Sequence, residues 1–378
     1  MPYWRLSGFY FFYFATLGVL IPYWGLYLKS VGLTPADIGN LMALFMFSRI
    51  VAPNVWGWIA DHSHQRMRVA RLASFLAALI FSAMFFGASF WWLAAVMLLF
   101  SFFWNAALPL LEVTTMNHSG ARAGSYARVR LWGSVGFIVS VLGLGPVLDR
   151  HGPWWVVPSL FALMLGIWLC SLLLPDASKP SAATPHSGRF LKNFFRLEVV
   201  AFLLACFLMQ ASHGPYYTFY SIYLESHGYS KSLIGGLWAF AVLCEVGVFL
   251  VAQHLFKLLS LRAMLLVSFA CATLRWLMIG HFPDQLGLLI VAQVLHASSF
   301  GSFHATAIQL VHRFFTGTHQ FRGQALYGSL GVGLGGAVGS LYSGYLWESA
   351  GPALTFNIAA LISAGAFLVT LFFIRARH

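Results

Sequence analysis

Long apolar runs separated by short polar segments make up almost the whole chain. A helix that crosses a lipid bilayer needs about 20 mostly apolar residues, and twelve runs reach that length. They cover approximately residues 6–28, 37–60, 69–89, 91–117, 126–148, 154–174, 197–224, 232–255, 261–281, 286–312, 322–346 and 352–374. The pattern predicts an all-α membrane protein with twelve transmembrane helices.

The polar segment at 175–196 lies between the sixth and seventh runs and contains the longest polar stretch of the chain, rich in Pro, Ser and Ala. This composition is typical of a linker. We therefore expect an N-terminal six-helix half at 1–174 and a C-terminal six-helix half at 197–378.

Positively charged residues are concentrated in alternate loops. One side would carry Arg5, Arg66, Arg68, Arg71, Arg122, Arg128, Arg130, Lys179, Arg189, Lys192, Arg196, Lys257, Arg262, Arg313, Arg322, Arg375 and Arg377. The other side would carry Lys29, Arg150 and Lys231. Cytoplasmic loops of membrane proteins hold an excess of Lys and Arg, so we expect both termini and the linker to be cytoplasmic.

Composition supports the same class of protein. Charged residues are 8% of the chain, hydrophobic residues are 60%, and the mean hydropathy is +0.78, whereas roughly 25% of a soluble protein is charged. The surroundings are therefore a lipid bilayer. The net charge of +12 follows from the loop pattern, and without a basic soluble surface we expect no nucleic-acid partner.

Two distant stretches repeat each other. YLKSVGLTPADIGNL at 27–41 aligns without a gap with YLESHGYSKSLIGGL at 223–237, at an offset of 196 residues. LWGSVG at 131–136 likewise matches LYGSLG at 326–331. The chain is thus two parallel copies of one six-helix half. Transporters built in this way bind their substrate between the repeats near mid-membrane, so the repeat favours transport of a small molecule.

Several motifs carry a family resemblance, in an order that covers most of the chain: GLTPADIG (32–39), VRLWGSVGF (129–137), QASHGPYYTFYSIY (210–223) and GYSKSLIGGLW (228–238). With twelve spans and a central linker, the chain resembles the major facilitator superfamily, in the branch of lactose permease, the nucleoside–proton symporters and the phenylpropionate permeases. The last of these resemble it most. The resemblance implies a monomeric proton symporter of the bacterial inner membrane that works by alternating access.

The segment GWIADHSHQRMR (57–68) is similar to the loop signature of that superfamily. Gly57, Asp61, Arg66 and Arg68 match the signature, while 62–65 depart from it. The resemblance implies that these four residues form a gating loop.

Ionisable residues inside a membrane span are costly and are candidates for function. Glu245 lies in the eighth run and Arg275 in the ninth, and we expect them to pair. Burial favours a neutral carboxyl group and a nearby Arg favours a charged one, so Glu245 could load and release a proton. In the resembled branch these positions belong to the substrate and proton site. A second acid of lactose permease is replaced by Ser299, which leaves Glu245 or a histidine to carry the proton.

Two further groups of polar residues mark the C-terminal half. Gln293 and His296 are one helical turn apart in the tenth run, which also contains His304. Gln210, His213 and Tyr217 recur at helical spacing in the seventh run. Gly214 and Pro215 are expected to loosen the helix there. A stripe of polar and aromatic side chains suits an aromatic ligand.

In the N-terminal half, Glu112 and Arg130 resemble the substrate-binding pair of the family, and Phe137 stands where lactose permease stacks a sugar on Trp. Arg49 lies in the second run and could reach a carboxylate. Arg49, Arg130 and Arg275 outnumber Glu112 and Glu245 among these deep groups, which favours an anionic substrate.

We therefore expect proton-coupled uptake of a small aromatic or other organic carboxylate. A proton symporter of a sugar or nucleoside is the alternative within transport. A membrane-embedded lipid-modifying enzyme would need acids or metal ligands clustered at one membrane face, and the outer acids are scattered over five loops.

The glycines of the eleventh run fit two patterns. Gly331, Gly333 and Gly336 fit G-x-G-x-x-G, but no strand precedes them. We therefore expect no nucleotide site there and no cofactor. We also expect no metal, because His62 and His64 alone in a loop do not make a metal site. Gly331, Gly335 and Gly339 are spaced four apart, with Ser343 next, and predict a face of small residues for close helix contact.

Overall fold

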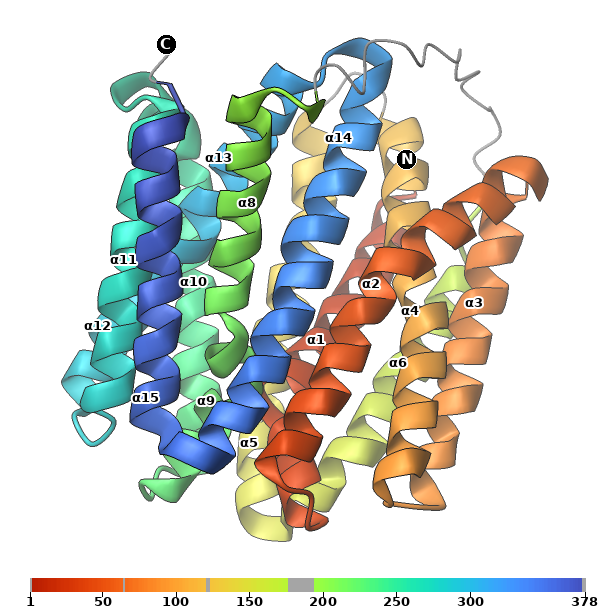
Figure 1. Cartoon of the computed structure of the whole chain (residues 1–378). Coiled ribbons are helices and arrows are strands. Elements are labelled where there is room, and N and C mark those ends of the chain that lie inside the picture. The colour runs from red at the N-terminus through yellow and green to blue at the C-terminus, as the bar shows by residue number, and fades with distance from the viewer. Residues whose placement is uncertain (1, 64, 120–122, 176–193, 376–378) are drawn as a thin grey trace. The chain divides into compact units, whose positions relative to one another are not determined.

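The computed structural model describes residues 2–63, 65–119, 123–175 and 194–375 (Figure 1). Within these ranges the regular structure is helical and includes no strand. Eleven of the helices in the described ranges are long and apolar enough to cross a membrane. The predicted all-α membrane fold is confirmed.

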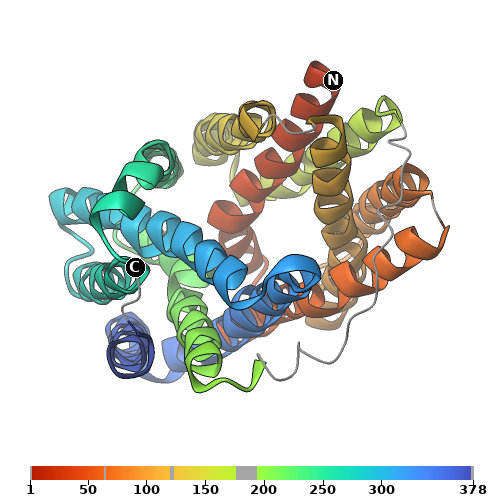
Figure 2. The same cartoon turned by 90° about the horizontal axis from the view of Figure 1, so that it is seen from above.

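Six spans precede the linker, and the division between the third and fourth falls at 86–89. They are α1 (Tyr3–Ser30), α2 (Pro35–Ser63), α3 (Arg66–Phe81) with the 3-10 turn η1 (Ser82–Phe85), α4 (Phe90–Ser119), α5 (Ala123–His151), and α6 (Val156–Leu172), which follows the 3-10 turn η2 (Pro153–Trp155). Helix α1 packs against both α5 and α6, as Figure 2 shows from above.

The spans after the linker are more interrupted. They are α8 (Leu197–Ser212) and α9 (Gly214–Ser226), α10 (Lys231–Leu258), α11 (Leu261–His281), α12 (Leu286–His296) with the π-helix η3 (Ala297–Ser302) and α13 (Phe303–Phe314), the 3-10 turn η4 (Gly317–His319), and α14 (Gln320–Leu326) with the π-helix η5 (Tyr327–Gly335) and α15 (Gly336–Phe373). The seventh span breaks at His213, directly before Gly214 and Pro215, so the loosening predicted there is confirmed.

The last two predicted spans are joined in one helical stretch, Arg322–Phe373, of 52 residues. About 20 helical residues span 30 Å, so this stretch is long enough for two crossings. Gly351, before Pro352, has a φ of 82° and interrupts the helix. In Figure 1 the blue ribbon of this C-terminal stretch doubles back. Because this one stretch provides two crossings, the eleven helices of the described ranges accommodate the twelve predicted spans.

The chain divides into two compact units. The N-terminal unit comprises Met1–Ser181 and Gly228–Ala239, and the C-terminal unit comprises Ala182–His227 and Phe240–His378. A division at the linker alone would place 228–239 with the second unit, whereas the first turns of α10 belong to the first. Residues 176–193, most of the predicted linker, lie outside the described residues.

The repeated stretch forms the same turn in both copies. Gly32 and Gly228 have φ angles of 87° and 83°, a left-handed conformation that glycine adopts without strain. Each turn leads into a helix that a hydroxyl caps. The Thr34 hydroxyl accepts the backbone N–H of Asp37 at 3.2 Å, and the Ser230 hydroxyl accepts that of Leu233 at 3.2 Å. Such caps satisfy N–H groups at a helix N-terminus.

Small residues bring the broken seventh span close to α15. A side chain at Gly214 would overlap the backbone of Gly339, and one at Gly335 would lie 2.7 Å from the Phe207 carbonyl oxygen. The predicted small-residue face is therefore a helix contact. Gly18, 196 residues before Gly214, meets the Phe137 backbone of α5 in the same way.

Candidate substrate and proton site

Glu245 and His296 approach each other within the C-terminal unit. Glu245 Oε2 lies 3.9 Å from His296 Nε2, and the two side chains are 17% and 5% exposed. Gly301 provides room for the carboxylate, because a Cβ there would lie 3.1 Å from Glu245 Cγ. The structure thus brings the eighth and tenth predicted spans together at two titratable groups.

Arg275 differs from expectation, since its partner is not Glu245. Its Nε donates to the Ala292 carbonyl at 3.0 Å, and its Nη2 donates to Gln293 Oε1 at 3.4 Å. Its guanidinium carbon lies 3.9 Å from the centre of the Tyr216 ring, a cation–π contact. Helix α11 packs against α12, and both hydrogen bonds join the guanidinium to residues of α12.

Gln293 is the centre of a buried hydrogen-bond network. Its Oε1 accepts the Tyr216 hydroxyl at 2.9 Å, and its Nε2 donates to the Tyr220 hydroxyl at 2.6 Å. Gln293 and Tyr220 are fully buried, so these bonds are worth more than they would be in water. Tyr216 is absent from the predicted residues. The helical stripe that marked its neighbour Tyr217 did not identify it, because the turn at His213 shifts the helix face.

His213 lies at the break between α8 and α9. Its Nδ1 is 2.8 Å from the Met209 carbonyl oxygen, and its ring contacts Tyr217 and Trp276 at centroid distances of 5.6 and 4.8 Å. Gln210, one turn earlier, is 5% exposed and faces η5, where a side chain at Gly335 would lie 3.0 Å from the Gln210 Cβ. Of the predicted stripe, His213 and Tyr217 therefore join the aromatic cluster and Gln210 supports helix packing.

Three rings form a stack along the tenth span. His296 and Phe300 are 5.4 Å apart and Phe300 and His304 are 6.1 Å apart, with an interplanar angle of 7° in each pair. In an α-helix of 3.6 residues per turn, positions 296 and 304 would be about 80° apart. The wider π-helix η3 between them offsets that rotation. His304 Nδ1 also lies 2.9 Å from the Tyr327 hydroxyl.

The predicted residues of the N-terminal unit form a second group. Glu112 interacts with Arg130 and is hydrogen-bonded to Tyr126. Arg130 lies 3.9 Å above the Phe14 ring. Tyr13 lies within electrostatic range of Arg49, Glu112 and Arg130, so the structure gathers these three charges around α1.

Two predicted residues of this unit make more local contacts. The guanidinium carbon of Arg49 is 5.3 Å from the ring centre of Phe45, one turn earlier in α2. Phe137 is 8% exposed, and its backbone forms part of the contact between α5 and α1. Phe137 therefore contributes to the packing of α5 against α1.

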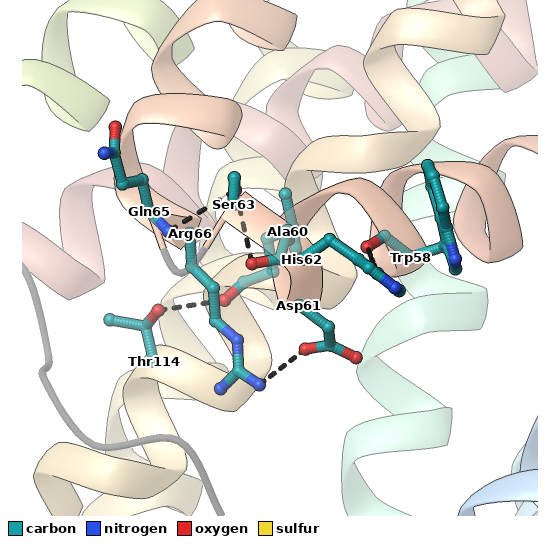
Figure 3. A network of polar contacts seen from close by, with 9 residues as sticks. Trp58, Ala60, Asp61, His62, Ser63, Gln65, Arg66 and Thr114 are labelled. Carbon is teal, nitrogen blue, oxygen red and sulfur yellow. Dashed lines mark hydrogen bonds and ion pairs between the residues drawn. The ribbon is translucent and has the colours of Figure 1, made fainter.

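The predicted gating loop forms an exposed polar network between α2 and α3 (Figure 3). Arg66 Nη2 contacts Asp61 Oδ1 at 2.8 Å, and Arg68 Nη1 donates to Gln65 Oε1 at 2.9 Å. Nothing lies within 4 Å of a Cβ built on Gly57. The Asp–Arg part of the signature is thus an ion pair across the loop, whereas space at Gly57 would admit a side chain.

Comparison with known proteins decides the family. The model of the MFS_1 like family matches residues 3–358. The chain belongs to this family of the major facilitator superfamily. It is a multi-pass membrane transporter and not an enzyme.

Among relatives of this transporter is a probable 3-phenylpropionic acid transporter of Escherichia coli (strain K12). The two are 32% identical over 373 residues, which cover 96% of this chain and 95% of the relative. A maltose permease of Geobacillus stearothermophilus is 29% identical, over 94% of this chain and 91% of the permease. The crystal structure of the nucleoside transporter NupG shares the fold, with a TM-score of 0.85, 16% identity and 98% of each chain covered.

Proposed function

We propose that this transporter takes up a small organic carboxylate, an aromatic one in particular, together with a proton by alternating access. Two groups of residues are proposed to take part. One group, in the C-terminal unit, comprises Glu245, Arg275, Gln293, His296 and the aromatic residues around them, and the other, in the N-terminal unit, comprises Arg49, Glu112 and Arg130. The transporter works as a monomer in the bacterial inner membrane with both termini cytoplasmic.

The observation that carries the proposal is the contact between Glu245 and His296. A carboxyl group and an imidazole 3.9 Å apart and nearly buried can share or exchange a proton, and ionisable groups inside spans mark ion and proton pathways. Aromatic side chains lie beside them, the buried Tyr216 and Trp276 and the partly exposed Phe300, and they supply surfaces for an aryl group. The name of the 32% identical relative points to the same substrate class.

Purified protein in liposomes tests the proposal. With an alkaline interior, the proton gradient should drive accumulation of labelled 3-phenylpropionate above the external concentration, and a protonophore should abolish it. Accumulation unaffected by the protonophore would contradict proton coupling, and the absence of any carboxylate uptake would contradict the substrate class.

A sugar or nucleoside proton symporter is the second candidate. It is supported by the 29% identity to a maltose permease and by the fold shared with a nucleoside transporter. Competition separates the two, because excess maltose or nucleoside should leave 3-phenylpropionate uptake unchanged if the transporter selects carboxylates.

A further inference from the structure

Four buried nitrogen atoms of the C-terminal unit have no hydrogen-bond partner among the described residues. One is Arg262 Nε, and the other three lie in one cluster: Arg275 Nη1, His213 Nε2 and His296 Nδ1. Buried polar atoms are nearly always hydrogen-bonded in native proteins, and each exception calls for an explanation such as a catalytic or ligand-binding role or a bound ion. Three exceptions within one cluster indicate a common cause.

All three residues surround one pair of rings, Tyr216 and Trp276, whose centroids are 5.8 Å apart. Arg275 lies over both rings, at 3.9 and 4.6 Å. His213 contacts Trp276 at 4.8 Å, and His296 contacts Tyr216 at 5.7 Å. The unpartnered nitrogen atoms therefore belong to side chains that share one aromatic wall.

The charge of Arg275 is uncompensated in this cluster. The side chain is 0% exposed, and among the described residues no carboxylate lies within ion-pair distance of it, since its oxygen partners are the neutral Ala292 carbonyl and Gln293 amide. A buried charge without a counter-ion is strongly destabilising. Arg130 in the other unit differs, because Glu112 stands beside it.

The bonds to Ala292 and Gln293 hold the Arg275 side chain in place. They occupy Nε and Nη2 and leave the Nη1 end of the planar guanidinium available. Arginine presents its N–H donors in a fixed fork that matches a carboxylate. An anion at Nη1 would meet a preset donor and would need little reorganisation of the protein.

We propose that Arg275 Nη1 and His296 Nδ1 donate to the substrate carboxylate and form its seat, with Tyr216 and Trp276 as the wall for its organic part. His213 Nδ1–H donates to the Met209 carbonyl, so His213 Nε2 joins the seat as a donor when the ring is doubly protonated. The seat rests on the proposed function and assigns the anion-binding step to the C-terminal unit. The proposal also gives the two ring nitrogen atoms of His296 different partners. Nε2 faces Glu245, and Nδ1 serves the anion, so that one imidazole joins the proton group to the substrate.

Binding to the purified full-length transporter in detergent tests the seat. The probes are 3-phenylpropionate and its neutral analogue 3-phenylpropanamide, measured by calorimetric titration. Hydrogen bonds to charged groups contribute about 1.5–3 kcal/mol, or at least about tenfold in affinity. The wild-type protein should prefer the carboxylate by that factor, and Arg275→Gln should remove the preference while still binding the amide. Arg262→Gln, in the first turn of the same helix, is the matched control and should keep the preference.

If Arg275→Gln does not fold, Arg275→Lys keeps the charge but loses the fork. It should weaken carboxylate binding relative to the amide. A full carboxylate preference in either folded variant overturns the seat and leaves the proposed function standing. Failure of the wild-type protein to bind any carboxylate overturns both. Carboxylate binding that depends on Arg275, without proton-driven uptake in liposomes, supports the seat and overturns proton-coupled symport.

Discussion

Two pairs of residues that correspond in the repeat each form a hydrogen bond, one pair in each unit, but the residue types differ. In the N-terminal unit the Trp24 indole N–H lies 3.4 Å from the Met97 sulfur. The residues 196 positions later are Tyr220 and Gln293, joined at 2.6 Å. The helix arrangement thus survives in both copies, while the second copy carries a polar network in place of a soft apolar contact.

Other equivalent positions differ in the same direction. The offset of 196 places His296 opposite Phe100, and Phe100 packs between Phe45 and Phe81 in an apolar core. It also places Glu245 opposite Arg49. The N-terminal unit therefore shows what the repeat needs to fold, and the departures from it in the C-terminal unit mark residues retained for another reason.

The largest expected effect concerns the close glycine contact between helices that occurs in both units. Gly18→Leu and Gly214→Leu should each prevent folding, because both glycines touch the backbone of the neighbouring helix and overpacking at rigid contacts is destabilising. The yield of monodisperse protein on size-exclusion chromatography measures this. Gly143→Leu, where a Cβ meets nothing within 4 Å, should be tolerated. Normal yield from either of the first two variants would show that the close contact is not common to both units.

Glu245→Gln should abolish accumulation of 3-phenylpropionate in liposomes and preserve exchange across the membrane, since the amide cannot carry a proton but keeps the shape of the site. Glu112→Gln, in the other unit, should weaken both processes, because it removes the partner of Arg130. Accumulation at the wild-type level by Glu245→Gln would remove this residue from the mechanism.

Gln293→Met places at this position of the C-terminal unit the residue type found at the corresponding position of the N-terminal unit, Met97. Loss of the partner of two buried tyrosines should cost about 1–3 kcal/mol, lowering both the thermal midpoint and the affinity for 3-phenylpropionate. The reciprocal change, Met97→Gln, should lower the midpoint alone. If Met97→Gln weakens binding as much as Gln293→Met, the proposal that the C-terminal position alone contributes to substrate binding is contradicted.

The smallest effect is expected at the helix caps of the repeated turn. The Asp149 carboxylate accepts the backbone N–H groups of Lys231 and Ser232 at 2.7 and 2.9 Å, at the start of α10. Asp37 performs a reciprocal cap with Thr34 on α2. Loss of a cap costs about 1 kcal/mol, so Asp149→Ala and Asp37→Ala should each lower the thermal midpoint by a few degrees. An unchanged midpoint in both variants would show that the caps are dispensable.

Much of the site was visible in the sequence as residue types. Glu245, Arg275, Gln293 and His296 were identified because polar groups are rare in apolar spans. The partner of Arg275 was predicted wrongly, and Tyr216 and Trp276 were missed. Tyrosine and tryptophan are common in this chain, so their presence carries little information until a neighbouring helix places a charged group on the ring.

The sequence by itself determined the number of spans, the break at Gly214 and the duplication. These depend on local properties, because an apolar run of sufficient length must be helical in lipid and glycine and proline weaken a helix locally. Only the tertiary structure decided which side chains meet. The rotation of α11 against α12 sends Arg275 to Gln293, and the π-helix η3 aligns His296 with His304. Helix rotation depends on packing with residues distant in the chain, which no local pattern records.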